Sequence, residues 1–392
     1  MSDIVIAAAA RTPVGSFNGS LSSLPAHDLG KVAIIEALKR AKVAPEDVNE
    51  VILGQILAAG EGMGPARQAA VFAGIPVEKT AYSINQLCGS GLRAVALGYQ
   101  AIRVGESAIV VAGGQESMSQ APHCAHLRSG TKMGDTSLVD TMIKDGLWDA
   151  FNGYHMGNTA ENVAQRWQIT REQQDVFAAQ SQARAEAAQK AGRFKDEIAP
   201  VTIATRKGDT IVDADEYPKH GTTVEVLAKL RPAFDKNGTV TAGNASPLSD
   251  GAAAALVMSK AKADALGIKP LGWFRAYATV GVDPAIMGIG PIPAVRRLLA
   301  RTGLKLTDID ILEVNEAFAS QSVYVQRTLE IPDDKLNLHG GAIALGHPLG
   351  CTGAKLTATA LHELRRRGGR YAIVTMCIGG GMGAAGLFEA AR

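Results

Sequence analysis

Four blocks of this 392-residue sequence occur twice in the same order, once toward each end. IVIAAAARTPVG from residue 4 resembles WFRAYATVGVDP from residue 273, and DVNEVILGQ (47–55) resembles DIDILEVNE (308–316). CGSGLRAVALGYQAI resembles GCTGAKLTATALHEL, and SAIVVAGGQES resembles YAIVTMCIGGG. These blocks alternate continuous apolar strands with amphipathic helices, which indicates strands buried on both faces. The duplication therefore predicts a layered α/β fold built from two similar halves.

The two copies differ by one long insertion. In the second copy GAAGLFEAA follows the glycines at once, whereas the matching DGAAAALVMS begins only at Asp250. We predict a first half over 1–118 that is completed by a strand over 250–268, an inserted loop domain over 119–249, and a second half over 269–392. The insertion contains one clear helix, REQQDVFAAQSQARAEAAQKAG. We expect it to cover the strand ends, where open α/β sheets bind ligands, or to act as an oligomerisation arm.

The segment CIGGGMGAAG (377–386) contains a match to the dinucleotide fingerprint G-x-G-x-x-G. That fingerprint requires a helix after the glycines and an acidic residue about 20 positions further on. Only LFEAAR follows here, so the pattern does not predict nucleotide binding. The glycines can instead turn backbone N–H groups toward an anion that forms during a reaction, beside Cys377.

Composition argues against several classes of partner. The chain has 40 basic and 38 acidic residues, so its charge gives no nucleic-acid footprint. The four cysteines form no C-x-x-C pair, and HCAH (123–126) lacks the remaining ligands of a zinc site, which favours a reducing compartment and no metal. The apolar run in MSDIVIAAAARTPVG is too short to span a membrane. We therefore expect a cytoplasmic protein with no membrane partner.

Two cysteines, a histidine and an asparagine lie at turns or strand ends. Cys88, in NQLCGSGLRA, precedes a predicted helix, whose dipole and free N–H groups can lower a thiol pKa to roughly 3.5–7.5. Free cysteine is also among the most buried residue types, and composition alone favours a packing role for Cys88. His347 is held in a turn of glycines and a proline, whereas Cys351 is interpreted as packing. Asn315, at the end of a repeated strand, carries an amide that can donate and accept.

Five motifs in this order resemble the thiolase family: NQLCGSGLRA, GGQESMS, NEAFA, GGAIALGHPLGCTG and CIGGGMG. The likeness covers essentially the whole chain and is strongest to the biosynthetic members. It implies two duplicated βαβαβαββ halves that form a five-layered αβαβα core, with a loop domain inserted in the first half. It also implies a homotetramer, a dimer of dimers, with a tetramer-forming loop over 123–134.

The resemblance further implies an acyltransferase that condenses two acetyl-CoA molecules to acetoacetyl-CoA and CoA, and catalyses the reverse thiolysis. Cys88 would be the nucleophile that carries the acetyl group, with His347 as its base. Cys377 would remove a proton from the second acetyl-CoA. One oxyanion hole would comprise His347 and a water held by Asn315, and the other the N–H groups of Cys88 and Gly379. No cofactor is implied, because CoA is substrate and product.

The CoA and acyl-pocket positions implied by the resemblance are Leu147, His155, Met156, Lys219, Phe234, Ser246, Met287, Ala317 and Phe318. Lys219 stands where similar enzymes carry an arginine near the nucleotide phosphate, which keeps the charge but loses the bidentate geometry. Met287 would narrow the acyl pocket toward acetyl and acetoacetyl chains.

Other functions remain as alternatives. A degradative 3-ketoacyl-CoA thiolase would use the same residues with a wider pocket. A ketoacyl-ACP synthase is disfavoured by NEAF together with CIGGG. A non-catalytic carrier of CoA thioesters or lipids would lack one of the two cysteines or the histidine, and all three are present.

Overall fold

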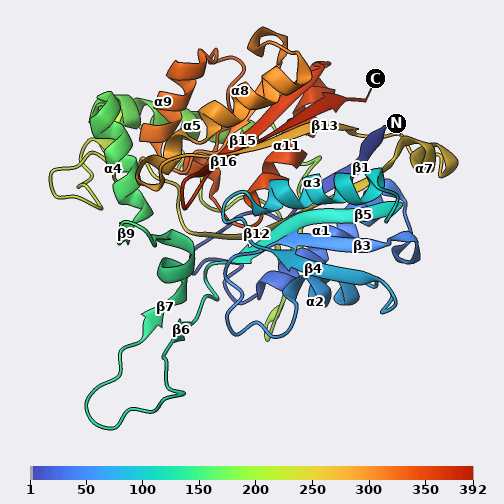
Figure 1. The fold of residues 1–392 in the computed structure, drawn as a ribbon, viewed down its shortest axis with the longest axis horizontal. Helices are drawn as coiled ribbons and strands as arrows, with labels where there is room; N and C mark the ends of the chain where they lie inside the picture. Colours follow the sequence, from blue (N-terminus) through green and yellow to red (C-terminus); the bar gives the residue numbers. More distant parts are fainter. Residues whose placement is uncertain (1–2, 392) are drawn as a thin grey trace.

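A computed structural model describes residues 3–391, and its first half follows the predicted order of strands and helices (Figure 1). This half comprises β1 (Ile4–Arg11), α1 (Ala26–Ala41), β3 (Glu50–Gly54), α2 (Pro65–Phe72), β4 (Thr80–Ile84), α3 (Ser90–Arg103), β5 (Ile109–Ser117) and β12 (Ser249–Ser259). The short β2 (Gly15–Ser16) pairs with β12. The predicted strand over 250–268 is too long: it ends at Ser259, whose hydroxyl caps α7 (Lys260–Ala265).

The second half repeats this plan with one strand fewer. It comprises β13 (Gly272–Gly281), α8 (Pro291–Thr302), β14 (Ile311–Val314), α9 (Ala319–Leu329), α10 (Ala342–Leu345), α11 (Thr352–Arg367), β15 (Tyr371–Ile378) and β16 (Met382–Ala390). The counterpart of β4 is reduced to an isolated bridge between Leu312 and Leu336. Asn337 explains the difference, because its φ of 41° turns the backbone away and its side-chain amide bonds both the N–H and the carbonyl of Val314. The predicted βαβαβαββ pattern is therefore complete only in the first half.

The strands of the two halves are joined where β1 pairs with β13. Helices pack on the outer face of each half and between the two halves. The hydrogen-bonded order is β14-β15-β16-β13-β1-β12-β5-β3-β4, and Val5–Trp273 and Ile6–Gly272 pair where the halves meet. One apolar cluster lies under α1 and α2, a second surrounds α3 and α11 between the halves, and a third lies under α8 and α9. The predicted five-layered αβαβα arrangement is confirmed.

The central helices α3 and α11 approach each other through glycines. A Cβ on Gly91 would lie 2.8 Å from the Ala354 nitrogen, and one on Gly353 would lie 2.2 Å from the Leu92 nitrogen. Because any side chain would separate the backbones, these glycines bring the first turns of both helices together. The segments just before the two helices, which carry Cys88 and His347, are thereby held on the same side of the core.

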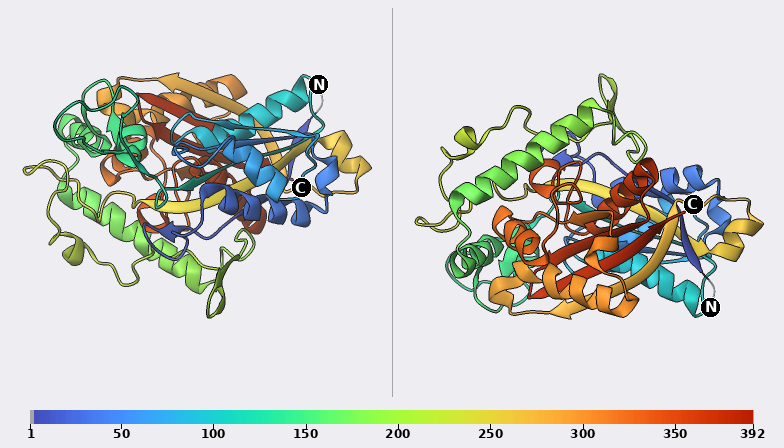
Figure 2. Two further views of the ribbon diagram at one scale, coloured as in Figure 1. Left: turned by 90° about the horizontal axis from the view of Figure 1, so that it is seen from below. Right: turned by 90° about the horizontal axis from the view of Figure 1, so that it is seen from above.

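The insertion leaves the core after β5 and returns at β12, which pairs antiparallel with β5. The predicted helix is confirmed as α5 (Arg171–Lys190), which begins with a capping box of Thr170 and Gln173 and runs along one side of the core (Figure 2). The insertion also contains α4 (Met156–Trp167) and α6 (Val224–Leu227), which were not predicted. Its strand pairs are β6–β7 (His123–Cys124, Val139–Asp140), β8–β9 (Trp148–Asp149, Tyr154–His155) and β10–β11 (Val201–Thr205, Gly208–Val212).

The loop between β6 and β7 projects away from the layered body (Figure 1). It carries exposed apolar side chains, including Leu127 at 54% and Met133 at 95% exposure. Within residues 3–391 the helices are all too short or too polar to cross a membrane.

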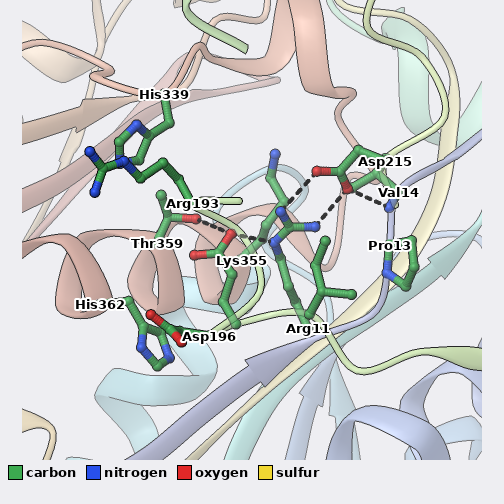
Figure 3. Close-up of polar contacts among 12 residues, drawn as sticks. Arg11, Pro13, Val14, Arg193, Asp196, Asp215, His339, Lys355, Thr359 and His362 are labelled. Atoms are coloured by element: carbon green, nitrogen blue, oxygen red, sulfur yellow. Dashed lines mark hydrogen bonds and ion pairs between the residues drawn. The ribbon is translucent and has the colours of Figure 1, made fainter. Parts of the chain in front are cut away.

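A buried ion network attaches the insertion to the core (Figure 3). The Arg11 guanidinium, at the end of β1, donates two hydrogen bonds to Asp215 at 2.6 and 2.9 Å and one to Glu197 at 2.7 Å. Thr359 of α11 donates to Glu197 at 3.1 Å. Two carboxylates from the insertion therefore depend on one arginine from the first strand.

We expect Arg11→Met to lower the free energy of unfolding by about 3–5 kcal/mol, because it leaves Asp215 and Glu197 buried without their cation. Urea denaturation followed by circular dichroism measures this change. Lys39→Met is the matched control: Lys39 pairs with Glu36 on the surface, its side chain is 76% exposed, and its removal should cost less than about 1 kcal/mol. Equal effects of the two substitutions would contradict the structural role of the network.

Candidate active site

Cys88 lies at a strained turn between β4 and α3. Leu87 has φ 48°, a left-handed conformation that is unfavourable for a side chain of this size. The Ser90 hydroxyl stabilises the turn, because it accepts from the Gln86 N–H at 2.8 Å and donates to the Leu87 carbonyl at 2.7 Å. The Leu87 N–H donates a further hydrogen bond to the side-chain oxygen of Asn85. The turn places the Cys88 thiol at the start of α3, as the sequence predicts.

The expected lowering of the Cys88 pKa is wrong. Burial raises the pKa of Cys88 to about 11, although hydrogen bonds from the backbone N–H groups of Gly379 and Cys88 act in the opposite direction. The desolvation of a thiolate by the surrounding apolar side chains outweighs two hydrogen bonds. The same two N–H groups were predicted to form an oxyanion hole, and the structure places both against the Cys88 sulfur. Cys88 is thus a protonated thiol at neutral pH and needs a base.

This pKa predicts how the alkylation of Cys88 depends on pH. The iodoacetamide labelling rate should rise about tenfold per pH unit from pH 6 to 9, because the thiolate fraction grows in that proportion below the pKa. Peptide mapping after brief labelling gives the rate, acetyl-CoA should protect Cys88, and buried Cys351 should react more slowly. A labelling rate that levels off near pH 7 would show a low-pKa thiol instead.

His347 follows α10 in a turn that only glycine permits. Gly346 has φ 98°, and a Cβ there would lie 2.4 Å from the Ser249 hydroxyl oxygen. The imidazole is buried at 4% exposure, and its Nδ1 lies 2.6 Å from the Thr352 hydroxyl. That hydroxyl donates to the Pro348 carbonyl at 2.9 Å, so it accepts from Nδ1–H and leaves Nε2 without a hydrogen.

The electrostatic surroundings keep His347 neutral. Burial lowers the pKa of His347 to about 3, and the buried ammonium of Lys355 adds to the effect. Asn315, just after β14, places its Nδ2 3.3 Å from Nε2 of His347. The Oδ1 of Asn315 is buried without a hydrogen-bond partner among the described residues. His347 and Asn315 therefore place an unprotonated ring nitrogen next to a side-chain amide.

Cys377 lies near the end of β15 and is fully buried. Burial raises the pKa of Cys377, and the nearby Cys88 raises it further. Cys88, from the other half, is therefore close enough to disfavour the ionisation of Cys377. Of the glycines that follow, Gly379 reaches the Cys88 sulfur, whereas Gly380 and Gly381 have φ of 77° and 84° and form the turn into β16. Only one of the three glycines thus faces the reactive sulfur.

A cavity of about 410 Å³ lies between the insertion and the turn that carries His347. Leu147, His155, Phe234, Ser246, Phe318 and His347 are among the residues that line it. The His155 ring stacks on Phe234 with centroids 4.7 Å apart, and its Nδ1 accepts from the Gly157 N–H. The lining residues Met118, Met142 and Leu349 belong to the apolar cluster against which Cys88 packs, while Ala245, Phe234 and Phe318 pack in the cluster that contains Cys377. The two cysteines do not line the cavity themselves, but each packs with residues that do.

The remaining implied contacts lie elsewhere. Met156, Met287 and Ala317 are buried in the cluster around Cys377. Lys219 is not among the lining residues: its side chain is exposed and its ammonium lies 4.9 Å from the centre of the Tyr217 ring, which does line the cavity.

Several site residues were missed by sequence analysis. Tyr217, Thr241 and Leu349 line the cavity, and Thr352 orients His347. Glu116 accepts from the N–H groups of Ile56, Leu57 and Gly350, and burial raises the pKa of Glu116 to about 7. A signal existed for Glu116, Leu349 and Thr352, which fall inside the quoted GGQESMS and GHPLGCTG motifs. Tyr217 and Thr241 come from irregular segments without a distinctive pattern.

Two thiols and a neutral histidine at the meeting point of duplicated α/β halves agree with the family models that match this chain. The thiolase N-terminal domain matches residues 4–261 and the thiolase C-terminal domain matches 268–390. The chain therefore belongs to the thiolase family.

Individual relatives agree over nearly the full length of the chain. The acetyl-CoA acetyltransferase of Shinella zoogloeoides is 61% identical and that of Rhizobium meliloti 62%, with 98% and 97% of each chain covered. The crystal structure of the Bacillus anthracis acetyl-CoA acetyltransferase has a TM-score of 0.97 and 43% identity, covering 100% of this chain and 99% of that one. Human mitochondrial 3-ketoacyl-CoA thiolase has a TM-score of 0.96 and 45% identity, with 99% of each chain covered.

Proposed function

We propose that this protein is an acetyl-CoA C-acetyltransferase that condenses two acetyl-CoA molecules to acetoacetyl-CoA and CoA, and catalyses the reverse thiolysis. The observation that carries the proposal is that the Cys88 sulfur lies against the N–H groups of Gly379 and Cys88 and close enough to Cys377 to raise the pKa of that thiol. The names of the relatives in Shinella and Rhizobium support it. Coenzyme A enters as substrate and product, and no other cofactor takes part.

In the first half-reaction, Cys88 becomes acetylated. Nε2 of His347 accepts the thiol proton, and the Cys88 sulfur attacks the carbonyl carbon of acetyl-CoA. The resulting oxyanion is stabilised by the N–H groups of Cys88 and Gly379, which already lie at this sulfur. The bond from the carbonyl carbon to the CoA sulfur then breaks, and CoA leaves as a thiol with the proton of Cys377, which becomes a thiolate, while His347 keeps the proton from Cys88.

In the second half-reaction, Cys377 removes a proton from the methyl carbon of another acetyl-CoA. The enolate oxygen is held by Nε2–H of His347, which carries the proton from Cys88, and by a water bound to Asn315, whose amide already adjoins the imidazole. The carbanion attacks the acetyl carbonyl on Cys88, the carbon–sulfur bond to Cys88 breaks, and the released sulfur takes back its proton from His347. Acetoacetyl-CoA leaves with both carbonyl groups formed.

The direct test is incubation of the purified protein with acetyl-CoA, followed by chromatography for acetoacetyl-CoA and free CoA and by mass spectrometry of the intact protein. We expect both products together with a protein species one acetyl group heavier. Absence of the acetyl-protein and of acetoacetyl-CoA would refute the proposed function and favour a non-catalytic carrier.

Chain length separates this function from a degradative 3-ketoacyl-CoA thiolase. Met287 is 4% exposed and packs with Phe318 beside Cys377, which leaves little room for a longer acyl chain. We expect kcat/KM for thiolysis of acetoacetyl-CoA to exceed that of the ten-carbon 3-ketoacyl-CoA by at least about tenfold. A steady-state assay across chain lengths measures this ratio. Met287→Ala should reduce it, and comparable values in the unsubstituted protein would point to the degradative type.

We further propose a cytoplasmic homotetramer, a dimer of dimers. The loop within 123–134 supports this assembly, because it projects from the body and exposes Leu127 and Met133. Analytical ultracentrifugation of the intact protein tests the tetrameric assembly directly.

A further inference from the structure

Gln321 is a buried amide held against the thiol of Cys377. It lies in the first turn of α9 with 0% exposure, and one terminal atom of its amide is 3.4 Å from the Cys377 sulfur. The segment Pro284–Ile289 closes over it, since a Cβ on Gly288 would lie 2.6 Å from the Gln321 Cβ. The side chain is therefore fixed in position beside a reacting atom.

The surroundings determine which end of the amide faces the sulfur. The amide oxygen satisfies its neighbours when it accepts from the Ser322 N–H at 2.8 Å and from the Ser322 hydroxyl at 3.1 Å. The amide nitrogen then donates to the Asn315 carbonyl at 3.2 Å. In this orientation the nitrogen occupies the position 3.4 Å from the Cys377 sulfur, and its second hydrogen is available to that sulfur.

We infer that Gln321 is a further catalytic residue, whose amide N–H donates to the Cys377 sulfur as this thiol becomes a thiolate. This inference rests on the proposed function, in which Cys377 removes the methyl proton. The proton passes from the methyl carbon to the thiolate. The hydrogen bond from Gln321 is strong while the sulfur is charged and weakens as the sulfur takes up the proton, and the amide hydrogen stays on Gln321.

A hydrogen bond of this kind favours the charged form selectively. A neutral thiol is a weak acceptor, whereas a thiolate accepts strongly from an N–H donor. Cys377 is fully buried, and the titratable group that acts on it is Cys88, which opposes its ionisation. Gln321 thus supplies stabilisation where the burial of Cys377 and its neighbouring thiol both disfavour the thiolate.

Two substitutions remove this donor while keeping the length of the side chain. Gln321→Met has no polar group, and Gln321→Glu has no hydrogen for the sulfur, because an ionised carboxylate repels the thiolate and a protonated one donates to Asn315. We expect exchange of the acetyl methyl hydrogens with solvent deuterium to fall by about 10- to 100-fold, the range for one hydrogen bond to a charged group. The pH profile of exchange should move to higher pH, and acetylation of Cys88 should fall far less.

Gln326→Met is the matched control, because Gln326 lies on the same helix but donates to Asp333 at 2.6 Å. It should exchange at the rate of the unsubstituted protein, and melting temperatures show which variants are folded. Unchanged exchange in either folded Gln321 variant would overturn this inference but not the proposed function. Equal losses of exchange and acetylation with an unmoved pH profile would also overturn it, since they indicate a structural role. Absence of exchange in the unsubstituted protein would overturn the proposed function and this inference together.

Discussion

Cys377→Ala should still be acetylated at Cys88 but should lose condensation and methyl hydrogen exchange by a factor of at least about 10²–10⁴, the usual effect of removing a general base. The two thiols interact electrostatically but belong to different halves, so each can be removed without deleting the other. Acetylation needs the Cys88 sulfur, the N–H groups against it and His347, and these remain in the variant. Acetylation should be slower in the variant, because in the unsubstituted protein the leaving CoA takes its proton from Cys377.

Cys88→Ala is the reciprocal variant, and it should form no acetyl-protein at all. Mass spectrometry of the intact protein reports acetylation, and exchange of the acetyl hydrogens into deuterated water reports proton removal. The buried Cys351→Ala is the control for loss of a thiol outside the reaction. The proposed roles are wrong if Cys377→Ala condenses acetyl-CoA at nearly the unsubstituted rate, or if the acetyl group is found on Cys377 in the unsubstituted protein.

His347→Ala should slow acetylation of Cys88 by about 10²–10⁴-fold at neutral pH. Because burial raises the pKa of Cys88 to about 11, its thiol is almost entirely protonated and depends on a base. Burial lowers the pKa of His347 to about 3, so its neutral form is present above that pH and is lost only as the pH falls through it. Acetylation should therefore show no loss from histidine protonation between pH 5 and 8.

The time course of acetylation from pH 5 to 9, followed by mass spectrometry, measures both effects. His220→Ala is the control, because His220 is exposed and bonds Gln189 in the insertion. A decline in acetylation below pH 7 with a midpoint near 6.5 would mean that His347 titrates as an ordinary histidine. An unaffected rate in His347→Ala would remove it as the base.

The sequence by itself determined the layered fold and the main members of the site. The duplicated pattern of buried strands and helices leaves few ways to cover both faces of each sheet, so two similar halves could be predicted. Cys88, Asn315, His347 and Cys377 all stand at turns or strand ends, and equivalent ends of a duplicated fold meet on one side. Local motifs therefore located them without coordinates.

The tertiary structure decided the properties that depend on distant segments. The Cys88 pKa was predicted to fall from its helix position, but apolar side chains from both halves and the insertion desolvate the thiol and raise it. The missing strand follows from the left-handed Asn337, and the orientation of the Gln321 amide follows from Ser322 and Asn315 together. Periodicity and motif spacing describe neighbours along the chain, whereas desolvation and hydrogen-bond partners are set by atoms that only folding brings together.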